Sequence, residues 1–213
     1  MKSVRIFYTK TDRMKFVSHL DMNRLMPRMI RKAGLPVWYT EGFNQHVYIN
    51  YAVPLSLGFE GTYEIMDIRL TEEDFPLEEV LRRLTAVTVP GITFWKAAEP
   101  VKPTKEITFA EYQITFPEGG DFFPRFTAFL QSDSILCRKT GKKGKVREFD
   151  LIPLIRRVET AGNTLSLVLT AGNENNLNPS LVLNTFFETA GIRPPYYTVI
   201  RRMLFDGEMQ PFL

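Results

Sequence analysis

The order of the predicted secondary-structure elements repeats along the chain, and this repeat limits the possible folds most strongly. In residues 1–97 the hydrophobic patterns predict strands at 4–9, 14–17, 37–40, 63–70 and 92–97, and helices at 19–33 and 76–84. A proline-punctuated connector follows at residues 99–104. Beyond it the patterns predict strands at 111–116, 135–139, 164–169 and 196–203, and helices at 122–130 and 179–191. Matching elements lie about 100 residues apart, and without the short strand at 14–17 each half reads βαββαβ.

This order predicts an α+β protein built from two tandem ferredoxin-like units, each a four-stranded antiparallel sheet backed by two helices. We expect an N-terminal domain of residues 1–98 and a C-terminal domain of residues 106–213. The duplication rests on order and spacing, because the side chains of the halves are only weakly alike. In RNA-recognition versions of this fold, aromatic rings on the open sheet face stack on bases. The candidate rings are Phe7, Tyr8, Tyr48, Tyr51, Tyr63 and Phe94, most of which we expect in the core.

Composition excludes several classes of protein. The 213 residues are 44% hydrophobic, enough for a sizeable core. The single cysteine, Cys137, excludes an internal disulfide and a cysteine-held iron–sulfur cluster. No apolar run is long enough for a membrane span and no signal-peptide pattern is present, so we expect a cytoplasmic protein without membrane contact. A net charge of +3 permits a polyanionic partner without requiring one.

The motifs of the common enzyme classes are missing as well. The chain has no phosphate-binding loop of the P-loop type, no dinucleotide-binding glycine pattern and no nucleophile elbow. It contains two histidines, His19 and His46, and their spacing offers no ready metal-ligand pair. We therefore predict no metal and no cofactor, and we assign no catalytic residue.

Residues 19–33 form a two-faced helix in this prediction. Ser18 is the expected N-cap, with Asp21 in the first turn. Met22, Leu25, Met26, Met29 and Ala33 recur on one side, which we expect to be buried. Arg24, Arg28 and Arg31 recur on the other side and predict an exposed basic row. Pro27 should kink the helix or restart it.

The two histidines suggest a polar cleft near the start of this helix. We expect His19 and His46 to line one cleft together with Asp21, Glu41 and Asn44, where free N–H groups of the helix would attract an anion. Lys10, Arg13 and Lys15 precede the helix and could neutralise a phosphate. A histidine can also serve only to cap its helix or to tie down its loop.

A second basic segment lies at residues 139–147, where five of nine positions are Lys or Arg. Lys142, Lys143 and Lys145 lie beside two glycines, a composition typical of a hairpin tip. The segment is either a solvated turn or a basic finger that reaches a phosphate backbone.

Several motifs together resemble the radical SAM-linked protein family, a domain of unknown function found alone or fused to radical SAM enzymes. They are FVSHLD at residues 16–21, RKAGLP at 31–36, EGFNQH at 41–46, VPLSLG at 53–58 and REFDLIP at 147–153. The chain departs from the family where Gln45 and Val47 replace prolines beside the loop histidine. The resemblance implies a radical SAM enzyme as a partner, one that acts on RNA or on ribosomal components.

Three functional hypotheses follow. The leading one is a non-catalytic accessory or substrate-recognition module that binds RNA and serves a radical SAM enzyme. A metal-independent endoribonuclease is the second, because CRISPR repeat-processing enzymes also pair two ferredoxin-like units; His19 or His46 would then act as acid or base. The third is a protein-binding scaffold. The oligomeric state stays open.

Overall fold

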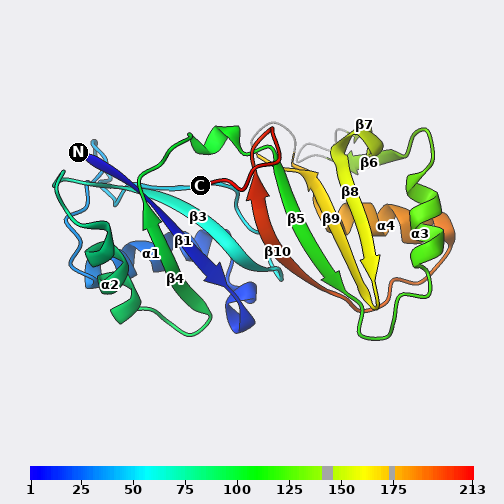
Figure 1. Cartoon of the computed structure of the whole chain (residues 1–213), viewed down its shortest axis with the longest axis horizontal. Helices are drawn as coiled ribbons and strands as arrows, with labels where there is room; N and C mark the ends of the chain where they lie inside the picture. The colour runs from blue at the N-terminus through cyan, green and yellow to red at the C-terminus, as the bar shows by residue number, and fades with distance from the viewer. Residues whose placement is uncertain (141–145, 173–175) are drawn as a thin grey trace.

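The computed structural model describes residues 1–140, 146–172 and 176–213, and it confirms the α+β class (Figure 1). The strands are β1 (Lys2–Lys10), β2 (Ile49–Tyr51), β3 (Glu60–Leu70), β4 (Ile92–Ala98), β5 (Phe109–Thr115), β6 (Leu136–Thr140), β7 (Val146–Asp150), β8 (Ile155–Ala161), β9 (Thr164–Thr170) and β10 (Thr198–Phe205). The α-helices of the described ranges are α1 (His19–Lys32), α2 (Leu77–Ala86), α3 (Phe123–Leu130) and α4 (Pro179–Ala190). Short 3-10 helices lie at Asp12–Phe16, Thr104–Glu106 and Ile152–Leu154.

One large, mostly antiparallel sheet of eight strands runs through the molecule. Its order is β4-β1-β3-β10-β5-β9-β8, and β2 pairs with β3. The first half thus has the order β4-β1-β3-β2, and the second half has the matching order β10-β5-β9-β8. The two halves share one strand order within a continuous sheet. Their description as two ferredoxin-like units, and the domain limits at residues 98 and 106, remain predictions.

The second strand of the second half is not the segment that we predicted. Residues 135–139 do not enter the large sheet, because β6 pairs with β7 in a separate two-stranded hairpin. The sheet position belongs to β8, which pairs with β9 at the edge. Most of β8 is solvent-exposed, so its sequence, IRRVETA, lacks the strict apolar alternation that marks a half-buried strand.

Two predicted strands of the first half are also wrong. The segment 14–17 belongs largely to the 3-10 helix Asp12–Phe16, whose first residue, Asp12, has a left-handed backbone conformation (φ 53°). Residues 37–40 make only isolated bridges, from Val37 to Leu70 and from Tyr39 to Val47. The regular strand that pairs with β3 comes later, as β2.

The two halves join where β10 pairs in parallel with the start of β3. Beneath this junction the Arg201 guanidinium binds the Glu64 carboxylate, with 2.9 Å from Nε to Oε1. Arg201 and Glu64 are both almost fully buried. A Cβ atom at Gly61 would lie 2.1 Å from Glu64 Oε1, so only glycine leaves room for the carboxylate at this position. One buried ion pair therefore links the halves.

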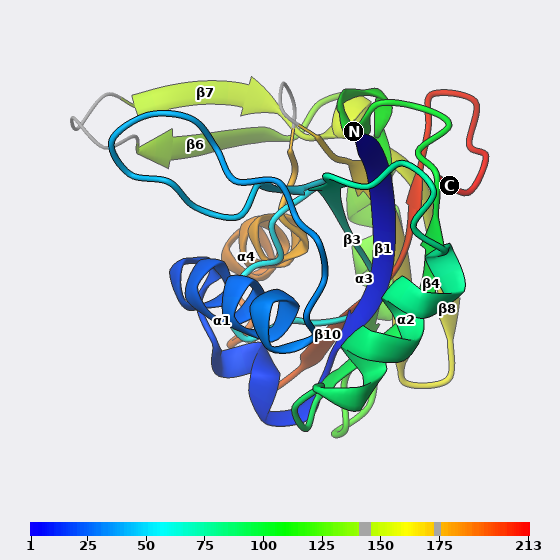
Figure 2. The ribbon, with the colours of Figure 1, turned by 90° about the vertical axis from the view of Figure 1, so that its left-hand side faces the viewer.

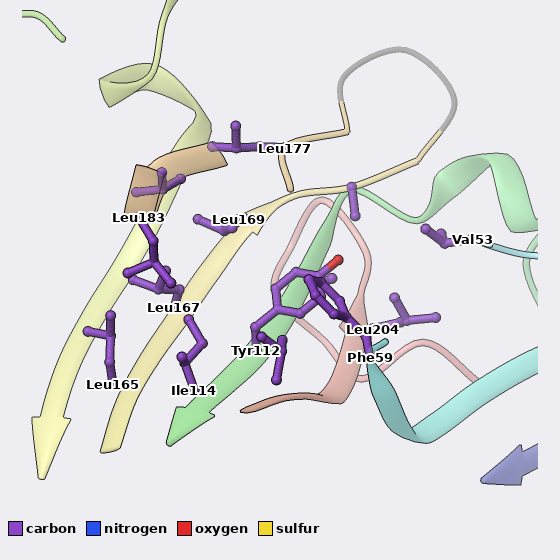
Figure 3. Close-up of a cluster of buried hydrophobic side chains, with 14 of the residues drawn as sticks. Val53, Phe59, Tyr112, Ile114, Leu165, Leu167, Leu169, Leu177, Leu183 and Leu204 are labelled. Atoms are coloured by element: carbon purple, nitrogen blue, oxygen red, sulfur yellow. The ribbon is translucent and has the colours of Figure 1, made fainter. Parts of the chain in front are cut away.

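Two hydrophobic cores support the sheet. The smaller core lies in the first half and contains the buried methionines of α1 together with residues of α2, β1, β3 and β4. The larger core fills the second half and also takes in first-half residues such as Val53 and Phe59 (Figure 3). Figure 3 shows Phe59 beside Tyr112 of β5, and their rings meet edge to face at 6.4 Å. The second core thus extends across the junction.

The C-terminal residues cover the sheet face of the first half that lies opposite α1. Phe212 is buried, and its ring lies 4.8 Å from the Arg5 guanidinium. The Tyr63 hydroxyl donates to the Phe212 carbonyl, and Arg5 donates to the carbonyl of Leu213. Phe7, Tyr8, Tyr63 and Phe94 are all buried. These rings belong to the core, as we expected for most of them, and cannot stack on a base.

Figure 2 shows what lies on the opposite side. The helices α1 and α4, the β6–β7 hairpin and the long loop after α1 all lie to one side of β1 in that view. None of the described helices is long and apolar enough to cross a membrane.

Candidate functional site

The helix α1 has the two faces that its sequence predicts. The Ser18 hydroxyl accepts a hydrogen bond from the backbone N–H of Asp21 at 3.1 Å and so caps the helix. Met22, Met26 and Met29 are buried, and Leu25 is half-buried. Pro27 lies inside the helix without ending it. The sequence therefore positions one apolar face against the sheet and the other face toward solvent.

The predicted basic row lies on the exposed face. Arg24, Arg28 and Arg31 are all solvent-exposed. Arg24 pairs with Asp21, with 3.2 Å between Nη1 and Oδ1, an exposed pair of the kind that contributes at most about 1 kcal/mol. No acidic group among the described residues lies within ion-pairing distance of Arg28 or Arg31. These two guanidinium groups can bind an anion without first breaking an ion pair.

Residues 37–48 form a hairpin-shaped loop after α1, which we call the 37–48 hairpin. The backbone N–H of Thr40 donates to the His46 carbonyl at 2.8 Å, and that of Tyr48 donates to the Trp38 carbonyl at 3.2 Å. The Arg69 guanidinium of β3 lies over the rings of Trp38 and Tyr48, at 5.4 and 4.5 Å from their centroids. The base of the hairpin is thereby held against the sheet.

The tip of the 37–48 hairpin is exposed throughout residues 41–46. His46 is tied to its own loop, because its Nδ1 lies 3.1 Å from Thr40 Oγ1 and 3.0 Å from the Asn44 carbonyl oxygen. Phe43 is fully exposed, at 110% of the reference area. We did not single out Phe43 in the sequence, although an aromatic ring in an otherwise polar, glycine-containing loop is the signal that identifies it.

A small cleft with a volume of about 20 Å³ opens beside the start of α1. Tyr8 and Lys10 of β1, His19 of α1 and Glu64 of β3 line it. Tyr51 of β2 and Leu55 of the segment between β2 and β3 close another side. The cleft thus collects polar groups from three strands and one helix.

The interior of the cleft contains buried charges. Lys10 is 3% exposed and donates to the Val17 carbonyl at 2.7 Å. Burial lowers the pKa of Lys10, although the nearby Glu64 carboxylate opposes this effect. Burial likewise raises the pKa of Tyr8, and Glu64 raises it further. Both shifts follow from the burial of these two side chains.

His19 lies at the mouth of this cleft. Its ring meets Tyr51 edge to face at 5.1 Å, and its Nε2 lies 3.3 Å from the Asn23 side-chain amide. Partial burial lowers the pKa of His19, and the positive charge of Lys10 adds to the effect. The Tyr51 hydroxyl is already engaged, because it donates to the Met22 carbonyl.

The predicted site residues therefore fall into separate groups. Lys10 and His19 share the cleft, but Asp21, Glu41, Asn44 and His46 do not line it. Lys15 pairs with Glu60 at 3.0 Å, and Arg13 is exposed. Lys142, Lys143 and Lys145 lie outside the described residues. The structure thus places the two histidines in different settings, one in a cleft and one in a hairpin tip.

The arrangement offers exposed arginines, an exposed aromatic ring and a buried lysine, which are side chains that can contact an anionic ligand. Among the described residues, no group of three or more His, Cys, Asp or Glu side chains is placed to hold a metal ion.

Fold and site together define an α+β protein with a basic helix face and a small polar cleft. The chain belongs to a family described as uncharacterized proteins conserved in bacteria (DUF2344), whose model matches residues 3–179. The remaining residues, which include most of α4 and all of β10, lie beyond the match. No curated protein matches the chain.

Proposed function

We propose that this protein is a non-catalytic RNA-recognition module that presents RNA to a separate radical SAM enzyme. The observation that carries the proposal is the pair Arg28 and Arg31, which are exposed and lack an acidic partner among the described residues. Guanidinium groups of this kind bind phosphate in a bidentate geometry. The exposed helix face would therefore bind the RNA backbone.

The 37–48 hairpin adds a second type of contact. In Figure 2 this hairpin and α1 lie on the same side of β1. The exposed Phe43 ring offers a stacking surface for an unpaired base, and such stacking tolerates any base. Phosphate contacts from α1 and a ring contact from the hairpin together favour single-stranded or looped RNA over a regular duplex.

The radical SAM partner rests on the resemblance of the motifs at residues 16–58 and 147–153. The single cysteine, Cys137, is buried, so a cysteine-held iron–sulfur cluster would have to belong to the partner. The division of labour is thus an RNA-binding chain and a separate catalytic subunit.

The basic face can be tested by a pair of matched double variants. Arg28→Ala with Arg31→Ala removes two exposed arginines from α1. The control, Arg156→Ala with Arg193→Ala, removes two exposed arginines from the second half, with the same change of charge. Binding of a fluorescent single-stranded RNA is measured by anisotropy over a range of salt concentrations, with chelator present.

We expect the α1 variant to bind RNA more weakly and to lower the slope of log affinity against log salt by up to about 1.4, since each phosphate contact contributes about 0.7. The control variant should keep the parent slope. Equal losses of RNA affinity in the two double variants would mean that RNA responds only to the overall charge of the protein. That result would contradict the exposed face of α1 as the RNA-binding surface. Cleavage of the RNA in chelator would contradict a non-catalytic role.

A further inference from the structure

The cleft beside α1 contains one positive charge more than it can neutralise. Glu64 is the acidic residue that lines it, and both Glu64 oxygens already bind the Arg201 guanidinium. Lys10 is 3% exposed, and no carboxylate of a described residue lies within ion-pairing distance of it. Buried charges in proteins are normally paired. Lys10 is therefore a buried cation without a counter-ion among the described residues.

A second, independent group also points into the cleft without a partner. Tyr8 is 4% exposed and lines the cleft. Its hydroxyl makes no hydrogen bond to a described residue, whereas the hydroxyl of Tyr51 nearby is satisfied by the Met22 carbonyl. His19, which also lines the cleft, is the first residue of the 14-residue helix α1. All of these groups favour an anion.

Exposed apolar residues are chain neighbours of the cleft residues. Leu20 follows His19 in α1, and Leu57 lies two residues after Leu55. The N–H of Gly58 donates to the Lys15 carbonyl at 2.8 Å, which brings the backbone next to Leu57 close to the backbone next to Phe16. All three apolar side chains are more than 60% exposed. They offer contact area for the body of a ligand whose anionic end enters the cleft.

We propose that the cleft binds one phosphate monoester group, with Lys10, His19 and the Tyr8 hydroxyl as its contacts. The phosphate supplies the negative charge that Lys10 lacks, and it accepts hydrogen bonds from the lysine ammonium, the imidazole and the phenol. The apolar rim then contacts the attached nucleoside. The proposal deepens the proposed function, on which it rests for the source of the phosphate, a 5′-terminal group of RNA or a free mononucleotide.

Inorganic phosphate tests the cleft without RNA. It is titrated into the parent protein while the His19 ring signals are followed by NMR, and these signals should shift in a saturable way. Lys10→Met should weaken phosphate binding by at least about tenfold, because a charge-assisted hydrogen bond is lost. Tyr8→Phe, which removes only the hydroxyl, should weaken it by about threefold or more. The control Lys105→Met removes an exposed lysine elsewhere and should leave the affinity unchanged.

If Lys10→Met does not fold, the phosphate affinities of Tyr8→Phe and His19→Asn test whether phosphate binds in the cleft. Absence of phosphate binding in the parent protein, or unchanged affinity in the folded cleft variants, overturns the proposal.

Two oligonucleotides of one sequence distinguish the source of the phosphate. If the source is an RNA end, a strand with a 5′-phosphate binds about tenfold more tightly than the strand with a 5′-hydroxyl, and Lys10→Met removes the difference. If the source is a mononucleotide, the strands bind equally and a nucleoside monophosphate binds in the cleft. Failure of the α1 arginine face would appear differently, because Arg28→Ala with Arg31→Ala would leave RNA affinity intact while inorganic phosphate still binds.

Discussion

Glu64 and Arg201 are 137 residues apart in the chain, yet their side chains meet in the interior at the junction of the two halves. Burial by itself would lower the pKa of Arg201, but the adjacent Glu64 carboxylate outweighs this effect and the pKa is raised. Arg201 also donates to the Val53 carbonyl. Since both charges have lost their water, each depends on the other.

Substitution of Glu64 tests this dependence. Glu64→Gln leaves the Arg201 guanidinium buried without a counter-ion, so we expect the free energy of unfolding to fall by about 3–5 kcal/mol. The measurement is urea unfolding followed by circular dichroism. The double variant Glu64→Gln with Arg201→Met should lose less than the sum of the two single variants.

The matched control is Glu111→Gln, which removes one of the two acidic partners of the more exposed Arg157 and leaves Glu159. It should cost much less than Glu64→Gln, because exposed ion pairs contribute little. Similar losses for both substitutions would show that the buried pair has no special role at the junction.

At the scale of elements, the 37–48 hairpin is held at its base and exposed at its tip. Trp38 and Tyr48 pair with each other at 5.8 Å and contact Arg69, whereas Phe43 makes no ring contact with any described residue. An exposed ring on a well-held hairpin contributes little to folding. We therefore expect the Phe43 ring to contribute to binding rather than to stability.

Removal of the Phe43 ring should separate binding from stability. Phe43→Ala should leave the free energy of unfolding within about 0.5 kcal/mol of the parent value, because the side chain has no packing to lose. Binding of single-stranded RNA should weaken by about 1–3 kcal/mol if the ring stacks on a base. Urea unfolding and fluorescence anisotropy give the two values.

Tyr196→Ala serves as the control, since Tyr196 is 65% exposed but lies in the segment before β10. It should change neither quantity appreciably. Unchanged RNA affinity in Phe43→Ala would remove the hairpin tip from the proposed RNA-binding surface.

At the scale of the whole molecule, three features tie the halves together. The sheet is continuous from β3 to β10, the larger core includes residues of both halves, and the C-terminal residues cover β1. Arg5, for example, is fully buried, with its charge shared between Asp67 and the Leu213 carbonyl. Neither half is complete without groups from the other.

We therefore expect a single cooperative unfolding transition. Both tryptophans, Trp38 and Trp95, lie in the first half, so tryptophan fluorescence reports on that half while far-ultraviolet circular dichroism reports on the whole chain. The two urea-unfolding curves should coincide. Phe212→Ala should shift both curves together and cost about 3–5 kcal/mol, because it empties a buried ring site. Two separate transitions would show that the halves unfold independently.

Local patterns in the sequence determined the features that depend only on neighbouring residues. The cap at Ser18, the 3.6-residue recurrence of methionines and the exposed arginine row of α1 all follow from residues within one helix. The α+β class followed from the order of such elements. The exposed Phe43 could have been read in the same way, as an aromatic residue within a polar loop.

Only the tertiary structure decided which segments pair and which groups meet. The choice of β8 rather than residues 135–139 as a sheet strand depends on pairing with β9, and local propensity does not encode a distant partner. Lys10 and Glu64 line one cleft, the Glu64 carboxylate binds Arg201, and His46 lies apart in its hairpin. Charge and burial at these positions arise from contacts between residues far apart in the chain. Periodicity and spacing therefore identified the helix face that we propose for RNA, while the cleft that we propose for phosphate became visible only in the folded chain.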